Sequence, residues 1–151
     1  MVWYSFVFFH DQPVYRGNVG TIRRAPILIA DDDAVTLDGL TEFLAQFGYA
    51  IASARNGQEA MNLLTGGLVP SLFIVDLAMP QLGGDELLKY VQSDPELRLV
   101  PVLVVTGAPD KIGRTVADAV LEKPVNLALL LSQVQRLTSP RRRNRNDRAL
   151  S

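Results

Sequence analysis

Residues 26–35 read PILIADDDAV, a run of apolar residues that stops at three aspartates in a row. Its apolar part, ILIA at 27–30, suits a strand that is buried on both faces. Carboxylates side by side repel one another, and in a dry site they resist ionising together. The three acids therefore either splay into water as a loop or gather around a positive charge, and the rest of the sequence has to decide between the two.

Short apolar runs of the same kind recur along the chain, with helical spacing of apolar residues between them. They are LFIV at 72–75, VLVV at 102–105 and, more weakly, YAIASA at 49–54 and AVLE at 119–122. Gly48 fits the end of a first helix, and Asn56 fits the N-cap of a second. Strands that alternate with helices predict a doubly wound α/β fold around a parallel sheet.

Composition excludes several classes of site. The chain has 151 residues, 48% of them hydrophobic, which is enough for one domain with a real core. It has no cysteine, so disulfides, cysteine nucleophiles and thiolate metal sites are excluded. His10 is the single histidine, which argues against a histidine-based zinc site. No apolar run approaches the length of a membrane span.

The two ends of the chain differ from its middle. Residues 1–25 begin with the aromatic-rich MVWYSFVFF, which lacks the basic start and the small-residue cleavage site of a signal peptide. We expect this extension to lie outside the compact domain at 26–138. Residues 139–151 are predicted to be a disordered basic tail, since 140–151 carry a net charge of +4 against −5 for the rest of the chain.

Polar side chains follow four of the predicted strands, where each strand ends. Asp31 and Asp32 follow the first, Asp76 follows LFIV, Thr106 follows VLVV and Lys123 follows AVLE. Ligands of such sheets bind beyond the carboxyl ends of the strands. Three carboxylates at one edge predict a hard divalent cation held by oxygen ligands, such as Mg²⁺. Lys123 would add a second positive charge.

The constellation resembles the receiver domain of bacterial two-component response regulators, of the chemotaxis type. The matching pieces, in order within residues 26–138, are LIADDD, IVDLAMPQLGG, VVTG and LEKPV. The resemblance implies a flavodoxin-like fold with five parallel strands. It also implies a cis peptide bond before Pro124, as is usual in the family.

The resemblance gives the edge residues roles. Asp76 is then the phosphoacceptor, Thr106 hydrogen-bonds the phosphoryl group and Lys123 forms an ion pair with it. The Mg²⁺ ligands would be the carboxylates of Asp31, Asp32 and Asp76 and the backbone carbonyl of Ala78. A carboxylate can attack a phosphoryl group to give an acyl phosphate. Phosphoryl transfer otherwise depends mostly on positioning and charge neutralisation, which these residue types supply.

The resemblance also implies the biological setting. The protein would be a cytoplasmic single-domain response regulator, a signalling protein that catalyses only its own phosphorylation and dephosphorylation. The phosphodonor would be a sensor histidine kinase or a histidine phosphotransfer protein. Output would come from contact with a downstream protein of unknown identity or from onward phosphotransfer, with no membrane partner and without direct nucleic-acid binding.

Three differences from the family pattern concern output. The segment from Thr106 to Lys123 is short, so the fourth helix is predicted to be reduced to a turn or two. Val120 stands where the family often has an aromatic switch residue, and Gly83 where it often has an acid. None of these differences removes a residue assigned to phosphorylation.

Two alternatives remain open from the sequence. The first is a pseudo-receiver, a protein-binding module of the same fold that is not phosphorylated. The second is a haloacid dehalogenase-type phosphatase, whose Asp-x-Asp-x-Val opening also matches here, with Asp31 as nucleophile and Asp33 as general acid. That alternative leaves Asp76 without a role. Asp33 also has a simpler interpretation as the N-cap of the following helix.

Overall fold

The described part of the chain comprises residues 25–113 and 116–139 of a computed structural model. The aromatic start of the chain and the basic segment at 140–151 lie outside the described residues. No helix within the described ranges is long and apolar enough to cross a membrane.

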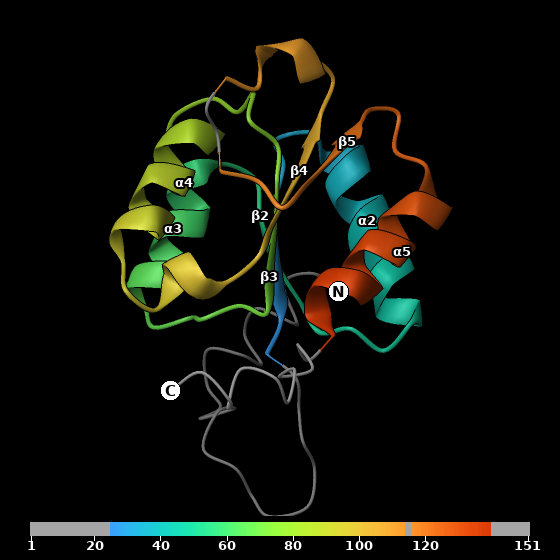
Figure 1. The fold of residues 1–151 in the computed structure, drawn as a ribbon, viewed down its shortest axis with the longest axis horizontal. Coiled ribbons are helices and arrows are strands. Elements are labelled where there is room, and N and C mark those ends of the chain that lie inside the picture. The colour runs from blue at the N-terminus through green and yellow to red at the C-terminus, as the bar shows by residue number, and fades with distance from the viewer. Residues whose placement is uncertain (1–24, 114–115, 140–151) are drawn as a thin grey trace, which may run out of the picture.

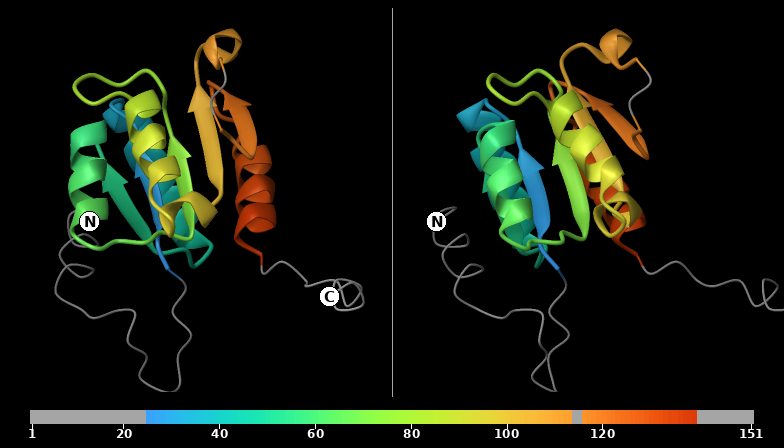
Figure 2. Two further views of the ribbon diagram at one scale, coloured as in Figure 1. Left: turned by 60° about the vertical axis from the view of Figure 1, so that its left-hand side comes forward. Right: turned by 90° about the vertical axis from the view of Figure 1, so that its left-hand side faces the viewer.

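Five parallel strands form one sheet in the order β2-β1-β3-β4-β5. Their bounds are β1 (Ile27–Ala30), β2 (Ile51–Ala54), β3 (Leu72–Val75), β4 (Val102–Thr106) and β5 (Ala119–Glu122). All arrowheads therefore point to the same edge of the sheet (Figure 2). The strand order reverses between β1 and β3, and such a switch point is where doubly wound sheets bind ligands. The predicted fold class is confirmed.

Helices cover both faces of the sheet (Figure 1). One face carries α3 (Gly57–Thr65), α4 (Gly84–Ser93) and the short 3₁₀ helix η1 (Leu97–Leu99), and the other carries α2 (Ala34–Gln46) and α5 (Leu127–Thr138). Alternate residues of each central strand enter opposite cores: Leu28 and Phe73 pack toward α3 and α4, whereas Ile29 and Ile74 pack toward α2 and α5. Burial on both faces explains why these strands are continuously apolar.

The edge strand β5 is covered less completely than the central strands. Ala119 and Leu121 pack against the α5 side, but Val120 on the opposite face is 42% exposed. In the part of the β4–β5 connection that the structure describes, helical structure is limited to the three-residue 3₁₀ helix η2 (Pro109–Lys111). The fourth helix is thus shortened as predicted, to this single turn, and no helix of the described residues covers Val120.

Helix α3 begins with a side-chain cap that the sequence predicted. The Asn56 carboxamide oxygen accepts a hydrogen bond of 2.8 Å from the Glu59 backbone N–H, and the Glu59 carboxylate accepts one of 2.8 Å from the Arg55 N–H. We expect Asn56→Ala to lower the free energy of unfolding by about 1 kcal/mol, because the Glu59 backbone N–H loses its side-chain acceptor. Urea unfolding measures this. Asn56→Ser, which retains a capping oxygen, should lose much less.

Candidate functional site

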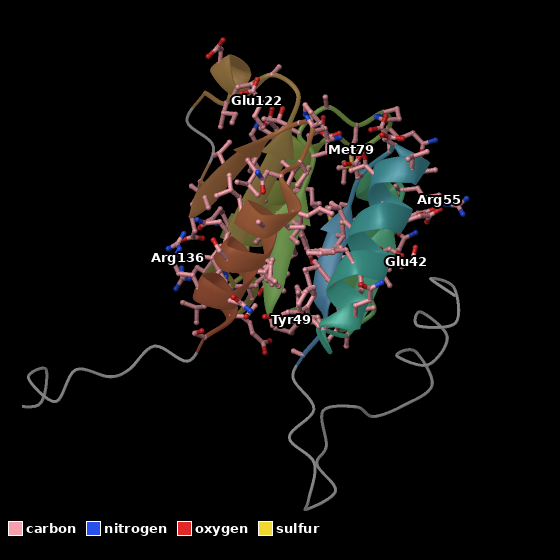
Figure 3. The ribbon with its side chains drawn as sticks, turned by 90° about the vertical axis from the view of Figure 1, so that its right-hand side faces the viewer. Glu42, Tyr49, Arg55, Met79, Glu122 and Arg136 are labelled. Atoms are coloured by element: carbon pink, nitrogen blue, oxygen red, sulfur yellow. The ribbon has the colours of Figure 1, made fainter. Side chains whose placement is uncertain are left out.

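The polar residues predicted to meet at one edge of the sheet do meet there. Asp31, Asp76 and Lys123 directly follow β1, β3 and β5, and Thr106 is the last residue of β4. Figure 3 marks this edge by Met79 and Glu122, at the opposite end of the molecule from Tyr49. The parallel direction of the strands, which is a property of the whole sheet, therefore brings together residues up to 92 positions apart in the chain.

Three carboxylates form a cluster at this edge. One oxygen from each of Asp31, Asp32 and Asp76 lies within 4.8 Å of the others. Asp31 and Asp76 are only 2% and 5% exposed, whereas Asp32 faces solvent. An all-oxygen cluster with two buried members and one solvent-facing member has the donor type that hard divalent cations prefer, with an open side for water ligands.

Lys123 lies among these acids and supplies the positive charge that a cluster of buried carboxylates needs. Its ammonium Nζ is 2.8 Å from the Asp31 Oδ2 and 3.1 Å from the Asp76 Oδ2. The lysine side chain is 22% exposed, so both ion pairs are partly shielded from water. The positive charge thus compensates the two buried carboxylates, while Asp32 remains toward solvent.

Burial and pairing oppose each other in the titration of these groups. Burial raises the pKa of Asp31, and the hydrogen bonds from Lys123 and the Asp33 backbone offset only part of that rise. For Lys123, burial disfavours the ammonium, but the hydrogen bonds and charges of Asp31 and Asp76 together outweigh it and raise its pKa. Lys123 therefore stays protonated at neutral pH.

Asp33 caps a helix, unlike Asp31 and Asp32, which belong to the carboxylate cluster. It is the N-cap of α2, where Oδ1 accepts a hydrogen bond of 3.2 Å from the Val35 N–H and Oδ2 one of 2.6 Å from the Thr36 hydroxyl. The Thr36 hydrogen bond in particular lowers the pKa of Asp33. Asp33 is not a member of the carboxylate cluster. The general acid that the phosphatase alternative requires is thus engaged as a helix cap.

Backbone groups fix the remaining predicted residues. The Ala78 N–H donates to the Asp76 Oδ1 at 3.0 Å, which ties the loop after β3 to the carboxylate that it follows. The buried Thr106 hydroxyl accepts from the Ala108 N–H at 3.1 Å, and the Thr106 carbonyl accepts from the Lys123 N–H at 2.8 Å. The bond between Lys123 and Pro124 is cis, as the resemblance implied. The ion pairs of Lys123 with the acids themselves were not part of the sequence prediction.

Comparisons with known proteins find relatives among the response regulators. Response regulator RR06 of Streptococcus pneumoniae is 31% identical over 116 residues, which are 74% of this chain and 52% of that protein, so the chain spans about half of its length. The polar-differentiation response regulator DivK of Brucella anthropi is 26% identical, and the match covers 72% of this chain and 92% of DivK.

Solved structures with the same fold include a signal receiver domain and a chemotaxis response regulator. The signal receiver domain of a signal transduction histidine kinase from Syntrophus aciditrophicus is 32% identical with a TM-score of 0.71, over 80% of this chain and 94% of that one. The chemotaxis response regulator CheY4 of Vibrio cholerae is 27% identical with a TM-score of 0.69, over 76% of this chain and 98% of that one.

A family model, the response regulator receiver domain, matches residues 27–135. That range contains all five strands and every residue of the carboxylate cluster. The chain therefore belongs to the response regulator receiver family, whose members are signalling proteins of two-component systems rather than classical enzymes.

Proposed function

We propose that residues 26–138 form a receiver domain that accepts a phosphoryl group on Asp76 from a histidine kinase or a histidine phosphotransfer protein in the cytoplasm. The observation that carries this proposal is the position of Asp76. Its carboxylate is buried at the switch point of the sheet, lies 3.1 Å from the Lys123 ammonium and belongs to a cluster of three acids. A nucleophile next to fixed positive charge is what phosphoryl transfer requires.

The transfer needs no further reactant. A carboxylate oxygen of Asp76 forms a bond to phosphorus while the bond from phosphorus to the donor's imidazole nitrogen breaks, and the electron pair of that bond returns to the imidazole. The product is an acyl phosphate on Asp76. Lys123 is placed to pair with the added phosphoryl oxygens, and the buried Thr106 hydroxyl can donate to them because it accepts, rather than donates, in its contact with Ala108.

The residues present fit a Mg²⁺ ion. We assign its protein ligands to the carboxylates of Asp31, Asp32 and Asp76 and to the backbone carbonyl of Ala78, with water completing the coordination. When bound, the ion would neutralise negative charge on the transferring phosphoryl group. The support for this assignment is that the carboxylate oxygens of three acids come within 4.8 Å of one another.

A protein phosphodonor has a surface to approach beside the site. A groove next to Lys123 is lined by residues from the start of α2 and from the connection between β5 and α5, among them Asp33, Val35 and Leu127. Val35 and Leu127 are exposed apolar side chains, which offer a partner area to bury. Signalling would then proceed through a downstream protein or through onward phosphotransfer.

Phosphorylation by a small-molecule donor tests the proposal directly. The chain is incubated with acetyl phosphate or phosphoramidate, once with Mg²⁺ and once with excess EDTA. We expect one phosphoryl group per chain, removable by hydroxylamine as an acyl phosphate is, and no incorporation with EDTA. A chain that binds Mg²⁺ but incorporates no phosphoryl group from either donor would support the pseudo-receiver alternative instead.

Removing the Lys123 charge should strengthen metal binding while weakening the response to phosphorylation. The Lys123 ammonium pairs with Asp31 and Asp76, two of the proposed Mg²⁺ ligands, so it competes with an ion for the same carboxylates. A partly exposed ion pair contributes about 1 kcal/mol, so Lys123→Met should tighten Mg²⁺ binding about fivefold. Isothermal titration with Mg²⁺ measures this. An unchanged or weaker affinity would show that the lysine does not compete with the ion.

A further inference from the structure

The N-terminus of α3 contacts the loop that follows the phosphoacceptor strand. The Gly57 backbone N–H donates to the Leu82 carbonyl oxygen at 3.0 Å, and Gly57 is buried at this point. A Cβ atom added to Gly57 would overlap that oxygen and would lie 2.7 Å from the Leu82 carbonyl carbon. Both obstacles are backbone atoms, so they cannot swing aside as a flexible side chain would. Only glycine permits this approach without moving the loop.

The same loop is held closely at its other contacts. Where α4 begins, a Cβ on Gly84 would lie 2.5 Å from the Asp76 carbonyl oxygen and 2.7 Å from the Leu77 Cα. Near the start of the loop, the Ala78 N–H donates to the Asp76 carboxylate. Between these points Gln81 has a φ of 57°, which few residues other than glycine adopt. The backbone between Leu82 and Ala78 therefore has little freedom to adjust, so a displacement of Leu82 should also move Ala78.

We propose that Gly57 is a positioning residue for the metal site: its close backbone contact with Leu82 sets the loop at 77–83, and thereby the Ala78 carbonyl, relative to the acid cluster. This inference rests on the proposed function, since it concerns the same Mg²⁺ ligands. Gly57 itself touches neither the carboxylates nor the phosphoryl position. It acts through the loop, as outer-shell groups orient the ligands of metal sites.

The variant Gly57→Ala tests this inference. Its methyl group forces the Leu82 carbonyl away, so we expect the Kd for Mg²⁺ to rise about tenfold, within the range that outer-shell substitutions produce. In the absence of metal, the amide NMR signals of Ala78 and Leu82 should already shift. That second readout separates a displaced loop from a general loss of stability, which would lower the unfolding midpoint without moving the loop signals of the folded chain.

Two control variants accompany it. Gln58→Gly weakens the same first turn of α3 at an exposed position, so it reproduces destabilisation of the helix without a clash. Gly39→Ala makes the same chemical change in α2, where an added Cβ meets nothing within 4 Å. Both should bind Mg²⁺ within about twofold of the parent chain, because neither reaches the loop at 77–83.

A second pair of variants changes the loop at 77–83 itself, at Gln81. These variants keep the test decisive if Gly57→Ala fails to fold. Gln81→Pro forbids the positive φ and must move the neighbouring Leu82 carbonyl, whereas Gln81→Gly accepts that φ freely. We expect Gln81→Pro to weaken Mg²⁺ binding about tenfold and Gln81→Gly to change it less than about twofold.

The outcomes separate the two hypotheses. If the parent chain binds no Mg²⁺ and takes up no phosphoryl group, the proposed function fails. If the parent binds Mg²⁺ and a folded Gly57→Ala chain binds it equally well, only the positioning role of Gly57 is overturned. Where Gly57→Ala does not fold, equal affinities in Gln81→Pro, Gln81→Gly and the parent overturn that role in the same way.

Discussion

Replacing Asp76 with asparagine is expected to abolish formation of the acyl phosphate. The carboxamide has nearly the same shape as the carboxylate but is a poor nucleophile, so the site keeps its outline and loses the reacting oxygen. The substitution also removes one of two negative groups that face Lys123, and Asp31 remains as its partner at 2.8 Å. The chain should therefore still fold. Uptake of phosphoryl groups from acetyl phosphate, followed by intact-mass analysis, measures the loss.

The adjacent acids supply the comparison for this variant. Asp33→Asn makes the same chemical change at the α2 cap, where asparagine caps as well as aspartate, and it should be phosphorylated at close to the parent rate. Hydroxylamine-sensitive labelling that persists at full level in Asp76→Asn would contradict the assignment. Mapping that label to Asp31 would favour the phosphatase alternative.

The second large effect is expected at Asp32, the solvent-facing member of the acid cluster. Asp32→Asn removes one full negative charge from the proposed ligand set of a divalent ion, and affinity for such ions depends on the number of charged ligands. Losing an outer-shell partner alone typically costs about 10–100-fold in metal affinity, so losing a ligand should raise the Kd for Mg²⁺ at least about tenfold. Isothermal titration measures the change.

Asp33→Asn is again the matched control, because it changes the net charge by the same amount one residue away. It should leave the Kd within about twofold, a difference that long-range electrostatics alone would produce and that added salt would reduce. If the two variants lose equal affinity, Asp32 contributes to the general field of the site and does not bind the ion. If neither loses any, Mg²⁺ binds elsewhere.

The strands could be predicted closely because burial on both faces leaves a simple trace in the sequence. The runs at 27–30 and 72–75 coincide with β1 and β3, since no polar residue is tolerated on either side of these strands. For the edge strands of the sheet the apolar sequence pattern is weaker. β2 begins at Ile51, two residues later than the apolar pattern at 49–54, and β5 alternates between half-buried and exposed residues.

The candidate site could be located from the sequence but its contacts could not. Strand ends place Asp31, Asp76 and Lys123 at one edge, but which acids the flexible lysine pairs with depends on distances of a few ångströms. The contact between Gly57 and Leu82 is harder to predict, because it joins two backbone groups that are 25 residues apart and that no side-chain pattern marks. Asn56-Gly57 reads in the sequence only as the start of a helix.

The incomplete cover of β5 has a consequence for the order in which the sheet opens. Among the described residues, β5 has a neighbouring strand on one side only and a helix on one face only, and its half-exposed Val120 lies beside the fully buried Val104 of β4. Segments with few buried apolar contacts have the smallest free energies of local unfolding. Amide protons of β5 should thus exchange with deuterium sooner than those of β1 or β3. Lys123 follows this strand directly, so the ammonium that pairs with Asp31 and Asp76 is attached to a strand that should open more readily than β1 or β3.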